Sequence, residues 1–342
     1  MNKVAVLGAG SWGTSLALVL CGNHHDVRLW THNPEQKEVM EQTRMNEKYL
    51  PNIKLPDNLA IFDDLQQAVD QVEAIVLVVP TKAIRETCQK LNQVLTKKVV
   101  IIHGSKGIEP NSHYRISEMI KEELSNELFD EVVALSGPSH AEEVSVQHPT
   151  TVTAASSNQE LARFTQDLFM SNYFRVYTST DIIGVELGGA LKNIIALGAG
   201  ISDGLGYGDN AKAALITRGL AEITRLATFK GANPLTFIGL SGMGDLIVTC
   251  TSQHSRNWRA GHLLGQGKPV DEVLEQMGMI VEGIRTTEAV AQLAEKEKVE
   301  MPITKGIYEV VYQNRPPKEV VDDLMARSRT NEIDDVMNRH LG

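Results

Sequence analysis

The first half of the chain alternates short, continuous apolar runs with polar or amphipathic segments. Continuous runs of this kind are typical of strands that helices cover on both faces. We predict such strands at residues 3–8, 26–30, 73–80, 98–107 and 131–139. Two more runs, 150–156 and 173–180, predict strands that extend the same sheet, with room for an antiparallel addition. The order of elements therefore predicts an α/β fold with an open, mainly parallel sheet.

The pattern changes after residue 180, where helix-length segments are joined by glycine-rich loops. Residues 286–299 and 303–313 have apolar positions at helical spacing. We therefore predict two domains, a sheet-containing domain at 1–180 and a mostly helical domain at 181–342. The charge-rich segment 327–340 is predicted to be a solvated face or tail.

The stretch from Val4 to Gly22 has no charged residue and is almost long enough to cross a membrane. A signal or membrane helix would not normally hold Gly8, Gly10 and Gly13 so close together. Between two predicted strands, the same glycines form the turn of a dinucleotide-binding unit. Gly8 allows the tight turn, Gly10 lets a pyrophosphate approach the backbone, and Gly13 lets the following helix pack on the strand. We therefore predict dinucleotide binding.

The residues after the second predicted strand bear on the choice of cofactor. No carboxylate occurs there before Glu35, so nothing repels a 2′-phosphate. Thr31 and His32 could contact that phosphate, or His32 could be a plain exposed loop histidine. NADPH is slightly favoured, and NADH is not excluded.

Three predicted strands end in residues that suit a ligand. These ends are Pro80-Thr81, Gly104–Gly107 and Gly137–Ser139. Because ligands bind beyond the carboxyl ends of parallel strands, we expect the three ends to line one crevice.

Residues 182–201 are nearly apolar all round, which predicts a buried helix. Glu186, Lys192 and Asn193 interrupt it, and a buried charge needs a partner or a purpose. The neighbours of Lys192 on its helix face are glycines and alanines, so we expect open space around the ammonium that a substrate could occupy. Proton transfer by Lys192 is the functional interpretation. A structural ion pair, with Glu186 as one candidate partner, is the alternative.

A glycine-rich segment, residues 239–267, contains Asp245 after a Ser-Gly-Met-Gly turn. Ser255 is a good N-cap for a helix that begins with Arg256 and Asn257. A helix N-terminus with an arginine in its first turn is a ready phosphate site. The alternative is a capped surface helix with a solvated arginine.

Composition limits the class of protein. The chain has 342 residues, a net charge of −10 with interspersed signs, and three widely spaced cysteines. This charge argues against a general nucleic-acid or membrane-surface role. The cysteine pattern argues against a disulfide framework and favours a reducing, cytoplasmic compartment. We see no cluster of metal ligands and predict no metal and no membrane span.

In this order, the motifs GAGSWGT, GSKG, SGPS, ELGGALKN, GMGDL, SRN and VEG resemble bacterial NAD(P)-dependent glycerol-3-phosphate dehydrogenases over essentially the whole chain. The resemblance implies an N-terminal Rossmann domain, a helical C-terminal domain and a homodimer. It implies reversible reduction of dihydroxyacetone phosphate to sn-glycerol 3-phosphate for phospholipid synthesis. Lys192 would then be the proton donor or acceptor.

The resemblance also implies the remaining site residues. Those around the substrate would be Lys106, Gly137, Ser139, Lys192, Asp245, Ser255, Arg256 and Asn257. Those at the cofactor would be Gly8, Gly10, Ser11, Trp12, Gly13, His32, Tyr49, Lys106, Ala141, Arg256, Ile280 and Glu282. Asp245 could orient Lys192 and a substrate hydroxyl.

Two other functions compete with this one. A related reductase of an unphosphorylated hydroxy acid could also use a lysine on an interdomain helix, but it would not need the Ser255-Arg256-Asn257 phosphate site. A nucleotide-sensing protein without catalysis would bind the cofactor, but it gives no reason for a buried Lys192.

Overall fold

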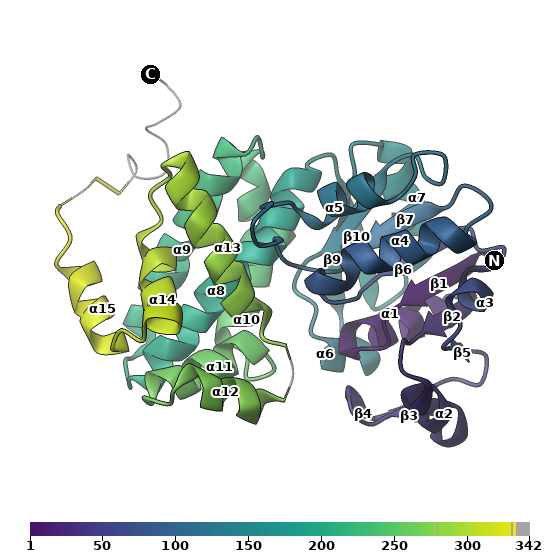
Figure 1. Ribbon diagram of the computed structural model, residues 1–342, viewed down its shortest axis with the longest axis horizontal. Coiled ribbons are helices and arrows are strands. Elements are labelled where there is room, and N and C mark those ends of the chain that lie inside the picture. The colour runs from purple at the N-terminus through teal and green to yellow at the C-terminus, as the bar shows by residue number, and fades with distance from the viewer. Residues whose placement is uncertain (279, 330, 333–342) are drawn as a thin grey trace. The chain divides into compact units, whose positions relative to one another are not determined.

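The computed structural model describes residues 1–278, 280–329 and 331–332 (Figure 1). It contains two compact units. The sheet unit comprises residues 1–106 and 114–182, and the helical unit comprises residues 107–113 together with the chain from 183 onward. Segment 107–113 therefore packs with the helical unit although it lies within the predicted first domain.

The sheet unit is built on eight strands in the order β10-β9-β8-β7-β6-β1-β2-β5. All neighbouring pairs are parallel except β8 and β9, so β9 and β10 form the extension with an antiparallel junction. The strands are β1 (Lys3–Leu7), β2 (Asp26–Trp30), β5 (Ala60–Phe62), β6 (Ala74–Leu77), β7 (Val100–His103), β8 (Val132–Ser136), β9 (Thr150–Ala155) and β10 (Phe174–Ser179).

Alternation along each strand divides the apolar side chains between two cores. Val4 and Val6 of β1 enter one core, whereas Ala5 and Leu7 enter the other. Because the side-chain period of a strand is two residues, a continuous apolar run supplies both faces. The predicted α/β architecture is confirmed.

Helices cover both faces of this sheet. They are α1 (Ser11–Gly22), α2 (Pro34–Thr43), α3 (Leu65–Val69), η1 (Thr81–Ala83), α4 (Ile84–Val94), α5 (Ile116–Glu123), α6 (Ala141–Ser145) and α7 (Gln159–Phe169). A small hairpin, β3 (Met45–Asn46) with β4 (Leu50–Lys54), follows α2. Sequence analysis did not predict this hairpin or β5, because β3 and β5 have only two and three residues and polar residues interrupt the apolar positions of β4.

The described part of the helical unit contains helices and turns. They are α8 (Ile182–Gly204), α9 (Asp209–Phe229), η2 (Pro234–Ile238), the π-helical turn η3 (Leu240–Gly244), α10 (Asp245–Thr251), α11 (Arg256–Gly265), α12 (Val270–Met277), α13 (Glu282–Glu297), α14 (Pro302–Gln313) and α15 (Pro317–Met325). By length and composition alone α8 could cross a membrane, but 89% of its most apolar window is buried. It is the central helix of this unit's core.

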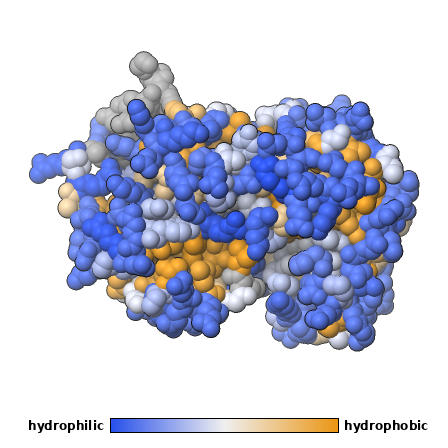
Figure 2. Space-filling view, viewed as in Figure 1, coloured by the Kyte–Doolittle hydropathy of each residue, from blue (hydrophilic) through white to orange (hydrophobic). Residues whose placement is uncertain are grey.

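Figure 2 shows a surface that is mostly hydrophilic, with apolar patches on both units.

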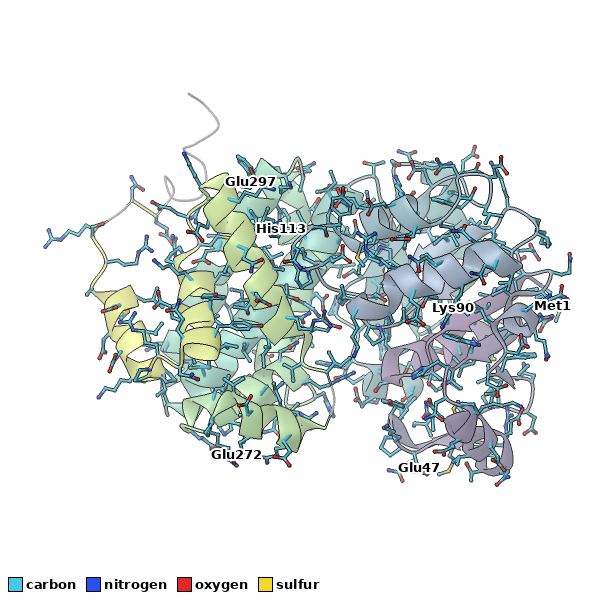
Figure 3. All side chains as sticks on the ribbon, in the orientation of Figure 1. Met1, Glu47, Lys90, His113, Glu272 and Glu297 are labelled. Atoms are coloured by element: carbon cyan, nitrogen blue, oxygen red, sulfur yellow. The ribbon has the colours of Figure 1, made fainter. Side chains whose placement is uncertain are left out.

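His113 lies beside the end of α13, where Glu297 is also found (Figure 3). Burial and the nearby Lys296 lower the pKa of His113. Of the predicted charged tail, Arg327–Arg329 and residues 331–332 are exposed, and the remaining positions lie outside the described residues.

Candidate active site

The glycine turn after β1 has the shape that a nucleotide needs. Gly8 has φ of +120°, and a Cβ there would lie 2.8 Å from the Val78 carbonyl oxygen. A Cβ on Gly13 would lie 1.9 Å from the Gly8 carbonyl oxygen, so α1 packs directly on the turn. A Cβ on Gly10 would meet no atom within 4 Å, which leaves an open approach to the backbone. The turn therefore fits a pyrophosphate at the N-terminus of α1, where helical N–H groups lack internal partners.

Two amides hold this turn from outside the motif. Gln36 Nε2 and Asn46 Nδ2 both donate to the Ala9 carbonyl, at 2.8 and 3.0 Å. Asn46 Nδ2 also reaches Thr14 Oγ1 at 2.8 Å. Sequence reasoning missed these residues because both follow the turn by more than 20 positions. The turn sits where β1 lies between β2 and β6, the point at which the strand order reverses.

Other predicted cofactor residues lie around this turn. Ser11 Oγ donates to the Tyr49 carbonyl at 2.6 Å, which brings Tyr49 to the start of α1. The Trp12 indole nitrogen lies against Gly104. Ser15 Oγ donates to the Ala141 carbonyl at 2.8 Å and ties α6 to α1.

Thr31 and His32, the two predicted contacts of a 2′-phosphate at the end of β2, differ in their exposure. Thr31 is 2% exposed, its hydroxyl donates to Gln36 Oε1, and the same hydroxyl accepts from Asn33 N. The Thr31 hydroxyl is therefore already engaged within the protein. His32 is exposed.

The ends of β7 and β8 bring the predicted substrate residues of the sheet unit together. Lys106 Nζ lies 3.5 Å from the Gly137 carbonyl oxygen, and Ser139 Oγ donates to that oxygen at 2.9 Å. These neighbouring strands are parallel, so their carboxyl ends share one sheet edge. The predicted clustering of the strand ends is confirmed for this pair.

In the helical unit, Lys192 forms a buried ion pair with Asp245. Lys192 is 7% exposed and Asp245 1%. The Lys192 ammonium also donates to Thr249 Oγ1 at 2.8 Å, and Thr249 in turn donates to the Asp245 carbonyl at 2.5 Å. The carboxylate stabilises the positive charge, and the two acceptors fix the direction of the ammonium.

The structure corrects the expectation of open space beside Lys192. A Cβ on Gly188 would lie 2.4 Å from the Ser241 carbonyl oxygen, so the backbone of η3 occupies that side. Farther along α8, a Cβ on Gly200 would lie 2.0 Å from the Trp258 carbonyl oxygen of α11. The glycines of α8 therefore allow close packing of helices.

Thr249 is a site residue that sequence reasoning missed. It lies four residues after Asp245 in α10, so both face the same side of that helix. This spacing was the available signal. Cys250 follows it, and burial raises the pKa of its thiol to about 12 although Lys192 acts in the opposite direction. Cys250 therefore stays protonated and is no nucleophile.

The start of α11 has the N-cap that the sequence predicts. Ser255 is the N-cap and accepts from Trp258 N at 3.2 Å. Asn257 Nδ2 donates to Asn193 Oδ1 of α8 at 2.9 Å. This bond joins the first turn of α11 to α8 at the residue that follows Lys192. Ile280 and Glu282 stand at the beginning of α13.

Comparison with known proteins identifies the family. Residues 3–162 match the family model described as NAD-dependent glycerol-3-phosphate dehydrogenase N-terminus. Residues 181–322 match the model for the C-terminus of the same family. The chain belongs to the NAD-dependent glycerol-3-phosphate dehydrogenase family. The predicted fold class, the oxidoreductase class and the use of NAD or NADP are thereby confirmed at the level of the family.

Individual relatives agree with this assignment. Glycerol-3-phosphate dehydrogenase [NAD(P)+] of Oceanobacillus iheyensis is 61% identical over 336 residues, covering 98% of this chain and 97% of the relative. That of Geobacillus kaustophilus is 62% identical over 339 residues, covering 99% and 98%. The crystal structure of glycerol-3-phosphate dehydrogenase from Coxiella burnetii has a TM-score of 0.91 at 39% identity, covering 95% of this chain and 99% of that one.

Proposed function

We propose that this enzyme reversibly reduces dihydroxyacetone phosphate to sn-glycerol 3-phosphate with NADPH or NADH. The observation that carries the proposal is the bond of 2.9 Å between Asn193 and Asn257. It joins α8, which carries the buried Lys192, and the first turn of α11, which carries Arg256, in one connected group of elements. A small molecule with a carbonyl and a phosphate suits such a group.

In the reductive direction, Lys192 is the proton donor. The charge of its ammonium is stabilised by Asp245, and Thr249 holds Nζ in place. Negative charge develops on the substrate carbonyl oxygen as the carbonyl carbon is reduced, and the lysine gives that oxygen a proton. In the oxidative direction, the neutral amine of Lys192 takes the hydroxyl proton back.

The phosphate is assigned to the first turn of α11. Ser255 occupies one helical N–H group as the cap, which leaves the N–H groups of the first two helical residues to face an anion. Arg256 adds a charged, bidentate donor. Binding of the phosphate holds the carbonyl beside Lys192, because remote binding energy can be used to orient the reacting group.

The cofactor contacts are proposed residue by residue. When bound, the reduced nicotinamide supplies a hydride to the carbonyl carbon. The proposed contacts are Gly8, Gly10, Ser11, Trp12, Gly13, His32, Tyr49, Lys106, Ala141, Arg256, Ile280 and Glu282. The proposed substrate contacts are Lys106, Gly137, Ser139, Lys192, Asp245, Ser255, Arg256 and Asn257. We further propose that residues 1–180 bind the cofactor and residues 181–342 carry the catalytic lysine.

The cellular role follows from the product. Glycerol 3-phosphate is a precursor of glycerophospholipids, so we propose that the enzyme is a cytoplasmic homodimer that supplies their synthesis. Sedimentation of the purified protein tests the dimer.

Initial rates test the reaction. We expect oxidation of NADPH or NADH with dihydroxyacetone phosphate and a much lower rate with unphosphorylated keto acids. Activity only with the keto acids would contradict the proposed substrate, and cofactor binding without any turnover would contradict catalysis. A comparison of kcat/KM for NADPH and NADH in wild type and His32→Asp tests the preference for NADPH, which the carboxylate should reverse.

A further inference from the structure

The N-terminus of α13 lacks a cap of its own. The helix begins at Glu282, and its N-cap residue, Val281, makes no side-chain cap hydrogen bond. The N–H group of Gly283 instead donates to Asn257 Oδ1 at 2.8 Å. Asn257 lies in the first turn of α11, 26 residues earlier in the chain. One helix therefore receives its capping acceptor from the side chain of another.

The orientation of the Asn257 amide is determined by its two partners. The Gly283 N–H group can only donate, so it must face the amide oxygen. The Asn257 nitrogen then donates to Asn193 Oδ1 at 2.9 Å. Asn257 and Asn193 are 8% and 6% exposed, so both bonds are protected from water. The side chain of Asn257 is thus tied to α8 and to α13.

The contact between α13 and this pair leaves no spare room. A Cβ on Gly283 would lie 2.7 Å from the Asn193 carbonyl oxygen and 2.7 Å from Asn257 Oδ1. The glycine lets the backbone of α13 approach both residues. Glu282 directly precedes Gly283 and Ile280 lies three residues before it, so we expect the point at which Asn257 holds the start of the helix to influence where both residues lie.

We propose that Asn257 is a positioning residue for the cofactor, whose side chain sets the location of Ile280 and Glu282. Its backbone N–H, in the first turn of α11, stays with the phosphate site. The proposal rests on the proposed function, in which Ile280 and Glu282 contact the cofactor. It adds to the role that the resemblance assigns to Asn257, which is contact with the substrate.

Two variants test the assignment. Asn257→Ala removes the acceptor for Gly283. Gly283→Ala keeps the Asn257 side chain but places a Cβ 2.7 Å from the Asn193 carbonyl oxygen and from Asn257 Oδ1, so the start of α13 must shift. For each folded variant, we expect the Kd of NADPH, measured by nicotinamide fluorescence without substrate, to rise about tenfold, as loss of one buried hydrogen bond allows. The Kd of NADPH without substrate is the deciding constant, because Asn257→Ala also removes a proposed substrate contact. In Gly283→Ala, which changes no proposed substrate contact, the KM for dihydroxyacetone phosphate at saturating NADPH should change by less than about threefold on the same scale.

Asn158→Ala is the matched control. Asn158 also accepts a backbone N–H, that of Glu160 at the start of α7, but it belongs to neither proposed site. This variant should leave both constants unchanged, which excludes a general effect of losing one cap.

The outcomes separate this inference from the proposed function. If the wild type neither binds NADPH nor reduces dihydroxyacetone phosphate, the proposed function fails. If the wild type is active and a folded variant raises only the substrate KM, or leaves the Kd of NADPH unchanged, the positioning role is wrong. Circular dichroism identifies the variants that fold. One folded variant, Asn257→Ala or Gly283→Ala, is enough to test the positioning role.

Discussion

Replacing Lys192 by methionine separates the two roles that a buried lysine can have. The side chain keeps its approximate length but loses its charge, so the Asp245 carboxylate, 1% exposed, is left buried without its partner. Breaking a buried ion pair in this way costs about 3–5 kcal/mol of stability. If Lys192 is also the proton donor, turnover should fall by roughly 10²–10⁴.

A second substitution distinguishes these effects. Asp245→Asn in the Lys192→Met background removes the unpaired charge, so most of the lost stability should return. Turnover should remain low, because no proton donor has been restored. Urea unfolding followed by circular dichroism measures the stability, and the absorbance of reduced nicotinamide measures turnover. Recovery of turnover together with stability in the double variant would show that Lys192 is structural and refute the proposed proton transfer.

Three further perturbations test other parts of the molecule. Gly13→Ala, whose Cβ would lie 1.9 Å from the Gly8 carbonyl oxygen, should lower both thermal stability and NADPH affinity, whereas Gly10→Ala, with open space around it, should lower affinity alone; equal stability losses would contradict this. Arg256→Ala should raise the KM for dihydroxyacetone phosphate by at least about tenfold, as loss of a charge-assisted contact predicts, and an unchanged KM would exclude the phosphate site. Burial raises the pKa of Glu222 from 4.5 to about 7. Because the carboxyl ionises at lower pH in the unfolded chain, the free energy of unfolding of wild type should fall by roughly 3 kcal/mol relative to that of Glu222→Gln as pH rises through this interval. Parallel curves of stability against pH for the two proteins, measured by urea unfolding, would exclude this effect of Glu222.

Much of the architecture was predictable because local patterns reflect it directly. The continuous apolar runs predicted the strands from β1 to β10 except β3, β4 and β5. The N-cap role of Ser255 followed from residue type and spacing. Lys192 stood out as a charge inside an apolar helix, whatever its partner.

The partners were harder to predict because they lie far apart in the chain. Asp245 was suggested through resemblance, but the bonds from Thr249 to Lys192 and from Asn257 to Gly283 join separate helices. The small residues of α8 were read as space for a substrate, whereas at Gly188 they admit the backbone of η3. A glycine can leave space for a ligand or admit another backbone. Which of these occurs depends on the element that packs against it.

The sequence by itself determined the strand–turn–helix unit at the N-terminus, the helical character of the second half and the residue types of the site. These properties depend on hydrophobic periodicity and on backbone preferences, which act over a few residues. The tertiary structure alone decided that Asp245 rather than Glu186 pairs with Lys192, that Thr31 is buried, and that Asn257 caps α13. Hydrogen bonds and ion pairs of this kind require atoms within about 3 Å, and only the packed chain brings them that close.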